Sequence, residues 1–384
     1  MNLVETLTWL VDTSSETGDE GRLCTEIAAR LYQTFGRESV DRVGNSLVVG
    51  PRDGEAPILL VGHIDTVPSQ GQSPSYIEDG RLHGLGATDM KSGVAVMLHL
   101  LEDREVRLRD RDLIGVFYAG EEGPAAGNEL EAVLTRAPWL SDAEFAIVLE
   151  PSDAEVQIGC NGLLNARVAF DGVSAHSARP WLGRNAITQA GSWLAAMHDL
   201  EPEPVEIDGL IYREVISVTR AMGGIANNII PDRFELNVNY RFAPNRSIEE
   251  ATDRLRQVCE GVDEFVIADA APAGPIDVNH PILNRLLSVS AAPRAAKQGW
   301  TDVARLGAHG IPAVNYGPGE TGLAHKKEES VRLDDLELVF ANLRTVLLDA
   351  ESPSELAGAW QAAERIPHDP DFMVAGSPLR DDDT

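Results

Sequence analysis

A histidine and an aspartate stand two residues apart at the end of an apolar run. The run covers residues 58–67, and the pair is His63 and Asp65. Residues two apart on a strand share one face, so both side chains can point into the same cleft. A metal-bound imidazole usually donates its second N–H to a carboxylate. The pair therefore fits a metal site in which Asp65 orients His63, although a single histidine at a strand end is more often structural.

Acidic residues follow two further apolar runs. Glu121 and Glu122 follow the run at 112–119 after a single glycine, and Glu150 ends the run at 145–150. Adjacent carboxylates beyond an apolar strand are costly unless water or a positive charge compensates them. One of the pair could bind a metal while its neighbour transfers protons, and an exposed turn is the alternative.

A glycine-rich segment at 84–93 carries Asp89, and a second glycine-rich loop precedes His325. Asp89 stands at the start of a helix expected at 91–102, where it could bridge two cations or cap that helix. A phosphate-binding loop is a third interpretation of the segment. It is disfavoured because the GK[ST] signature is missing and Asp89 occupies a position that is glycine in a dinucleotide fingerprint.

The alternation of apolar strands with helical patterns predicts a mostly parallel α/β sheet flanked by helices. Open sheets of this kind place their sites at the carboxyl ends of the strands. We therefore expect the histidines and carboxylates above to meet at one edge. The other elements expected here are a strand at 311–319 and helices at 3–12, 18–35 (with Thr17 as its N-cap), near 127–136 and at 331–350.

The middle of the chain has a different pattern, which predicts an inserted α+β domain for dimerisation or as a lid. Alternating strands are expected at 163–172, 214–224 and 233–243, helices at 185–198 and 248–262, and a linker at 267–281. The expected division is a catalytic domain at 1–163 and 279–350, an inserted domain at 164–278 and a flexible C-terminal extension at 351–384.

Composition and charge exclude several classes of protein. The 384 residues are 43% hydrophobic and 24% charged, which is typical of a globular protein. A net charge of −29 argues against nucleic acid and anionic membranes as partners. No apolar run approaches the ~18–20 residues of a spanning helix, and the N-terminal segment lacks the features of a secretory signal. Three widely spaced cysteines predict free thiols in a reducing cytoplasm.

The motifs resemble, in order and spacing, those of the two-zinc aminoacylase and carboxypeptidase-type metallohydrolases. The resemblance covers roughly residues 15–345 and implies a metal-dependent amide hydrolase with two Zn²⁺ per subunit, or with Co²⁺ or Mn²⁺ in one site. The motifs are HxDTVP at 63–68, GxGxxDMKxG at 84–93, EEG at 121–123, EP at 150–151, GxxxHSxxP at 172–180, NxIP at 228–231 and AH at 324–325.

The resemblance also implies a role for each site residue. Glu121 would be the general base, which takes a proton from water and returns it to the leaving amine. Asp65 would orient a ligand. The implied metal ligands are His63 and Glu150 for one zinc, Glu122 and His325 for the other, and Asp89 as the bridge between them.

Further residues match family positions that contact the substrate. His176 matches a histidine that stabilises the oxyanion from the inserted domain of a partner subunit, which implies a homodimer. Arg241 matches an arginine that binds a substrate carboxylate. Thr301 and Asp302 match a loop that lines the pocket. The remaining candidates for substrate binding are Asn227, Asn228, Arg179, Arg184 and Thr301.

Four segments are similar to those of actinobacterial members of this family that hydrolyse N-succinyl-LL-2,6-diaminopimelate in lysine biosynthesis. These segments are 175–187, 212–218, 230–247 and 299–319. Arginine suits the three carboxylates of that substrate, whereas Arg213 and other strand arginines are expected to be solvated. Hydrolysis of N-acetylornithine, of another N-acyl amino acid or of a dipeptide is the alternative within the same chemistry. A non-catalytic metal-binding homologue would lack the base or a ligand, and both are present.

Overall fold

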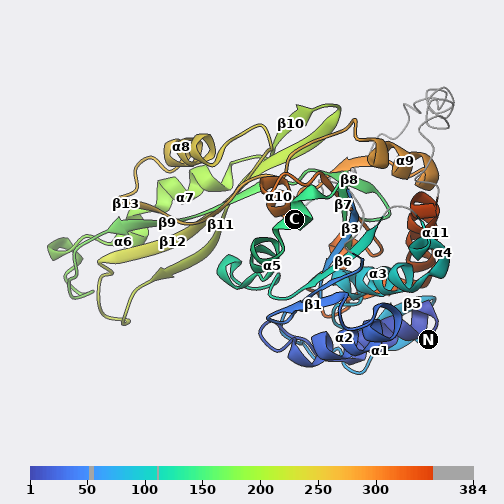
Figure 1. Ribbon diagram of the computed structural model, residues 1–384. Helices are drawn as coiled ribbons and strands as arrows, with labels where there is room; N and C mark the ends of the chain where they lie inside the picture. The colour runs from blue at the N-terminus through green and yellow to red at the C-terminus, as the bar shows by residue number, and fades with distance from the viewer. Residues whose placement is uncertain (52–55, 110–111, 349–384) are drawn as a thin grey trace, which may run out of the picture.

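The computed structural model describes residues 1–51, 56–109 and 112–348. The extension predicted at 351–384 lies outside the described residues. Two bodies of secondary structure are visible in Figure 1, one around strands β3, β6 and β7 and one around strands β9, β11 and β12. No helix among the described residues is long and apolar enough to cross a membrane.

The larger sheet has the strand order β1-β2-β6-β3-β7-β15-β8-β14. Its four middle strands, β6, β3, β7 and β15, run parallel to one another. β3, β6 and β7 are buried along their whole length, as expected for parallel strands covered on both faces. The bounds are β1 Val40–Val43, β2 Ser46–Val49, β3 Ile58–His63, β6 Leu113–Tyr118, β7 Phe145–Pro151, β8 Val156–Ile158, β14 Arg294–Ala296 and β15 Ala313–Gly317.

Helices cover both faces of this sheet and enclose two apolar cores. One core lies between the sheet and α1, α2, α3, α9 and α11, and the other lies beneath α5 and α10 (Figure 1). The mostly parallel α/β fold class predicted from the sequence is therefore confirmed. The bounds are α1 Leu3–Asp12, α2 Gly21–Phe35, α3 Ser92–Glu102, α4 Arg104–Arg107, α5 Leu130–Arg136, α9 Pro281–Ser290, α10 Val303–Ala308 and α11 Leu333–Leu348.

A small antiparallel sheet connects the glycine-rich segment to the chain that follows His325. Its order is β16-β5-β4, and Ser330 of β16 lies opposite His83 of β5. The loop that begins at Gly84 therefore starts beside the residues just before Ser330. The bounds are β4 Tyr76–Glu78, β5 Arg81–His83 and β16 Ser330–Arg332.

The second body is an antiparallel sheet in the order β10-β11-β12-β9-β13, with helices α6, α7 and α8. Its own apolar core joins the inner faces of β9 and β12 to Trp193 of α7 and Leu255 of α8. This arrangement is the separate α+β unit that the alternating pattern indicated. The bounds are β9 Gly162–Asp171, β10 Glu203–Ile207, β11 Leu210–Gly223, β12 Arg233–Phe242, β13 Glu264–Ala271, α6 Ala186–Gln189, α7 Gly191–His198 and α8 Ile248–Val258.

Three local expectations were wrong. The N-cap of α2 is Glu20, because Thr17 instead donates its hydroxyl to the carboxylate of Asp65 at 2.9 Å. The helix expected at 185–198 is divided at Ala190 into α6 and α7. The first part of the expected linker at 267–281 belongs to β13, which pairs with β9 at the edge of the sheet. Its residues alternate between half-buried and exposed, so its pattern resembles that of a polar linker.

Candidate metal centre

The four parallel strands deliver their polar groups to one edge of the sheet, as expected for an open α/β sheet. His63 is the last residue of β3, and Glu150 is the last residue but one of β7. Glu121 and Glu122 follow β6, and His325 follows β15 after a short turn. Ligand atoms of these residues and of Asp89 form groups in which all atoms lie within 4.8 Å of one another.

Asp89 lies between the two histidines and uses a different oxygen for each. His63 Nε2 is 3.2 Å from Asp89 Oδ1, and His325 Nε2 is 3.4 Å from Asp89 Oδ2. Glu150 Oε1 lies 3.6 Å from His63 Nε2, and Glu122 lies 2.9 Å from His325 Nε2. Two ligand groups that share Asp89 result from this geometry.

Each group has the donors that a divalent cation such as Zn²⁺ takes from proteins, namely imidazole nitrogen and carboxylate oxygen. The first group is His63, Asp89 and Glu150, and the second is Asp89, Glu122 and His325. Glu121 forms a third group with His63 and Glu122. The residues present therefore fit a pair of metal ions, and Glu121 lies beside them.

The pKa values at this edge reflect crowded negative charge. Burial raises the pKa of Glu121 well above its usual value, and burial together with Asp89 raises that of Glu150 to about 7. Burial opposes ionisation of Asp89, but hydrogen bonds from His325 and His63 outweigh it and lower the pKa. Hydrogen bonds to Asp89 and Glu122 raise the pKa of His325 to about 10. Positive charge therefore stabilises this cluster strongly.

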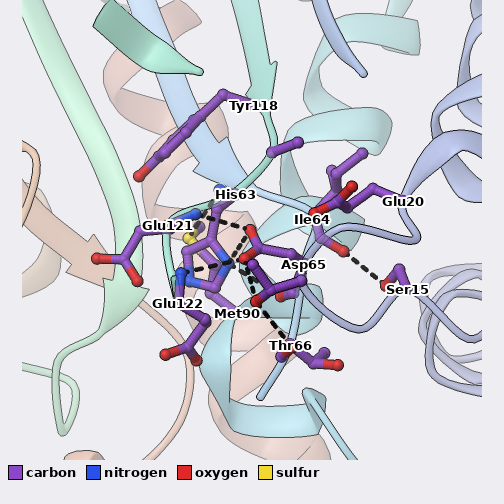
Figure 2. A network of polar contacts seen from close by, with 12 residues as sticks. Ser15, Glu20, His63, Ile64, Asp65, Thr66, Met90, Tyr118, Glu121 and Glu122 are labelled. Carbon is purple, nitrogen blue, oxygen red and sulfur yellow. Dashed lines mark hydrogen bonds and ion pairs between the residues drawn. The ribbon is translucent and has the colours of Figure 1, made fainter. Parts of the chain in front are cut away.

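Asp65 is buried beside His63 and holds the segment after β6 in place. His63 Nδ1 lies 3.0 Å from the Asp65 carbonyl oxygen and 3.5 Å from its Oδ1. The Asp65 carboxylate also accepts the backbone N–H groups of Glu121 at 3.1 Å and Glu122 at 3.0 Å. In Figure 2 the carboxylates of Glu121 and Glu122 point away from Asp65. The predicted position of Asp65 next to His63 is found, and Asp65 has a second task that the sequence did not indicate.

A cavity of about 690 Å³ opens over the metal-binding groups. Five of the six residues in the ligand groups line it, namely Asp89, Glu121, Glu122, Glu150 and His325. Thr301 and several cationic side chains line it as well. His63 does not line it because its side chain is fully buried behind the carboxylates. The cationic residues are Arg213, Arg294 and Lys297.

Comparison with known proteins agrees with this geometry. The model of Peptidase family M20/M25/M40 matches residues 59–349. This chain belongs to that family. A Mycobacterium tuberculosis protein that carries the provisional name succinyl-diaminopimelate desuccinylase DapE is 40% identical over 90% of this chain and 97% of its own length. The succinyl-diaminopimelate desuccinylase of Corynebacterium glutamicum is 37% identical over 88% of this chain and 94% of its own.

Solved structures of other peptidases share the fold. The aminopeptidase PepT of Bacillus cereus has a TM-score of 0.70 at 21% identity, covering 91% of this chain and 98% of its own. A dinuclear metal-binding M20 peptidase of Bacillus subtilis, YXEP, has a TM-score of 0.64 at 16% identity. The match covers 91% of this chain and 97% of that protein. Membership of this peptidase family identifies the chain as a metal-dependent hydrolase.

In this M20 chain a carboxylate of the protein itself occupies amides of the glycine-rich segment that a phosphate would need. The backbone N–H groups of Gly86, Thr88 and Asp89 all donate to the carboxylate of Glu329 at 3.0 Å. Asp89 is not a helix cap either, since Lys91 holds the N-cap position of α3. Of the three interpretations of this segment, the geometry favours the bridging carboxylate.

Two of the substrate-binding candidates line cavities, and the others lie on the exposed surface of the second body. Arg241 lines a second cavity of about 460 Å³ that shares Glu121 with the first, and Thr301 lines the first. The others are exposed in the second body, and within the described residues none of them lines either cavity: His176, Arg179, Arg184, Asn227 and Asn228.

Asp302 was wrongly expected to line the pocket. Its carboxylate is fully buried and accepts hydrogen bonds from Tyr118 at 2.7 Å, Asn128 at 3.0 Å and Arg305 at 2.8 Å. Arg213 was expected to be an ordinary solvated strand residue. It is exposed, but it faces the first cavity because β11 passes close to β14 there. Its strand pattern contains no signal for this position, since only the packing of the two bodies creates it.

We expect the thermal stability of the metal-free protein to fall as the pH rises from 5 to 7. Burial raises the folded-state pKa of Glu150 to about 7 from 4.5, and that of Glu121 also rises. Between these pH values the folded state binds protons that the unfolded chain has released, so unfolding becomes more favourable as the pH increases. Differential scanning fluorimetry of chelator-treated protein measures the melting temperature at each pH.

Added Zn²⁺ serves as the control in that experiment. Its stabilisation of the protein should be larger at pH 7 than at pH 5, because metal ligands must be deprotonated. A metal-free melting temperature that increases from pH 5 to pH 7 would contradict this account of the cluster.

Proposed function

We propose that this chain hydrolyses N-succinyl-LL-2,6-diaminopimelate to succinate and LL-2,6-diaminopimelate with two Zn²⁺ ions per subunit. The observation that carries the proposal is the pair of ligand groups sharing Asp89, in a chain 37–40% identical to relatives named for this reaction. Two zinc ions would supply Lewis acidity toward an amide carbonyl and the attacking water. His63 and Glu150 would hold one ion, Glu122 and His325 the other, and Asp89 both.

Glu121 is placed to move the protons of this reaction. It lies beside the ligand groups but outside the two groups that share Asp89. Its raised pKa, which burial causes, suits a group that accepts a proton from water and later donates it to the leaving amine nitrogen. The Asp65 carboxylate fixes the Glu121 backbone, so the base keeps its position while it changes charge.

The cationic residues of the two cavities support an anionic substrate. Within the described residues, Arg213, Arg294 and Arg241 have no carboxylate partner, although the chain has a net charge of −29. Burial lowers the pKa of Arg241, so this guanidinium is partly desolvated without a compensating anion. A substrate with three carboxylates would provide such anions. N-acetylornithine has a single carboxylate and a distal ammonium, and it matches these residues less well.

We also propose a homodimer in which residues 164–278 act as the lid and dimerisation domain. β10 covers only residues 210–214 of β11, and beyond them no described strand pairs with the outer edge of β11. Such an edge is a template for strand pairing. Met222 of β11 and Ile225, two residues beyond its end, are exposed apolar residues. Together these features support contact with a second copy.

The position of His176 supports the same conclusion. The Ser177 N–H donates to the Asn228 carbonyl at 2.9 Å, so the segments carrying His176 and the two candidate asparagines adjoin. This pair of segments lies at the end of the second sheet near α6, away from the first sheet (Figure 1). An oxyanion donor at this place would have to serve the metal centre of a partner subunit.

All three cysteines are free and buried, which suits a reducing compartment such as the cytoplasm.

The substrate assignment is tested by measuring kcat/KM for N-succinyl-LL-diaminopimelate and N-acetylornithine side by side with the zinc-loaded protein. We expect the succinyl substrate to be preferred by at least about 100-fold, because a substrate that lacks the matching carboxylates leaves the cationic side chains of the two cavities without anionic partners. Preference for N-acetylornithine would retain the chemistry and contradict the assignment.

The sharing of residues between subunits is tested by mixing two inactive variants. Glu121→Gln should retain zinc and lose about 10²–10⁴-fold in kcat, and His176→Ala should lose about 10²–10³-fold. When both are unfolded and refolded together at equal amounts, each heterodimer has one site with both residues intact. We expect about one quarter of the wild-type rate to return, from random pairing of two-fold symmetric subunits.

Two controls make the mixing experiment decisive. Each variant refolded alone should stay inactive, and size-exclusion chromatography with light scattering should give a dimer mass. A mixture that stays inactive, or a fully active monomer, would contradict donation of His176 by the partner.

A further inference from the structure

Glu329 is a buried acid close to the metal centre that does not belong to any of its ligand groups. The residue is 2% exposed. Its Oε1 accepts the backbone N–H groups of Thr88 and Asp89, and its Oε2 accepts that of Gly86, all at 3.0 Å. The whole carboxylate is therefore used to hold the backbone that carries Asp89.

The same residue ties this loop to the segment that carries His325. Glu329 lies four residues after His325 and directly before β16. Its carbonyl oxygen accepts the N–H of Gly84 at 3.1 Å, which continues the pairing of β16 with β5. The hydroxyl of Thr88 donates to the Ser330 carbonyl at 3.1 Å. The relative position of Asp89 and His325 thus depends on contacts made by Glu329 and its neighbour.

The backbone geometry of this loop matters because the Asp89 carboxylate must reach His63 and His325 at the same time. Its Oδ1 faces His63 and its Oδ2 faces His325, at 3.2 Å and 3.4 Å. A small rotation of the loop would improve one contact and lose the other. An acceptor that fixes three N–H donors of the loop, those of Gly86, Thr88 and Asp89, restricts this rotation, since buried N–H groups are costly to leave unpaired.

We propose that Glu329 is a positioning residue that holds Asp89 at the distance and angle needed to bridge two metal ions. The inference rests on the proposed function in so far as it assumes that the two ions bind. Asp65 has the corresponding role for Glu121 and Glu122, so each loop that carries ligands is held by a buried carboxylate on its backbone. Such supporting groups commonly control metal affinity as well as ligand orientation.

The test compares metal binding by the metal-free full chain of the wild type and of Glu329→Gln. The amide keeps one acceptor oxygen but places an NH₂ group where Gly86 or Thr88 and Asp89 need an acceptor. We expect the affinity for the second Zn²⁺, measured by competition with a chelating indicator, to weaken at least about tenfold. Visible spectra of the Co²⁺-loaded variant should differ from those of the wild type, because the ligand geometry around the ion changes.

Glu328→Gln is the matched control. It removes the same charge one residue earlier, from an exposed side chain, and should leave affinity and spectra unchanged. Circular dichroism of the metal-free proteins separates positioning from stability. A purely structural role would lower the unfolding temperature without changing either metal readout, and that result would overturn the proposal.

A further variant applies if Glu329→Gln does not fold. Glu329→Asp keeps the charge but withdraws the carboxylate by one methylene group, and weakened binding of the second ion would again support positioning. Binding at wild-type affinity by whichever variant folds would overturn it. A wild-type protein that binds fewer than two ions would contradict the proposed function itself, which is a different result from two ions bound equally by wild type and variant.

Discussion

The sharing of Asp89 between His63 and His325 is the interaction on which the site depends. It places one carboxylate within reach of two imidazoles, with Glu122 and Glu150 on either side. So much negative charge in a buried place is unfavourable unless cations compensate it. The raised pKa values of Glu121 and Glu150 are the electrostatic consequence in the protein alone. The electrostatics of the site therefore favour the binding of cations.

The fold positions the ligands with rigid strands and with loops whose backbone N–H groups are already hydrogen-bonded to buried carboxylates. Four parallel strands deliver the ligands to one edge of the sheet, and the loops between them would be free to move without further contacts. Asp65 and Glu329 accept the backbone N–H groups of the two loops that carry acidic ligands. Each of these acids stands close in sequence to a histidine of the centre, so one short segment supplies both a ligand and a support.

The sequence allowed prediction of the strand ends and of the residues that meet there, because apolar runs ending in polar groups follow directly from the burial of a parallel sheet. It did not indicate Glu329 or the second role of Asp65, because an acid that accepts backbone N–H groups leaves no pattern in residue types. Thr17 was mistaken for a helix cap because its true partner, Asp65, is distant in sequence. Arg213 was missed because its position depends on how two separately folded bodies pack.

The most direct test is a crystal structure of the zinc-loaded protein with anomalous scattering measured at the zinc edge. The account predicts two anomalous peaks about 3.5–4 Å apart, the usual spacing of two-metal sites. Asp89 should contact both peaks, and each should have one of the two histidines beside it. A single peak, or two peaks without Asp89 between them, would contradict the central claim.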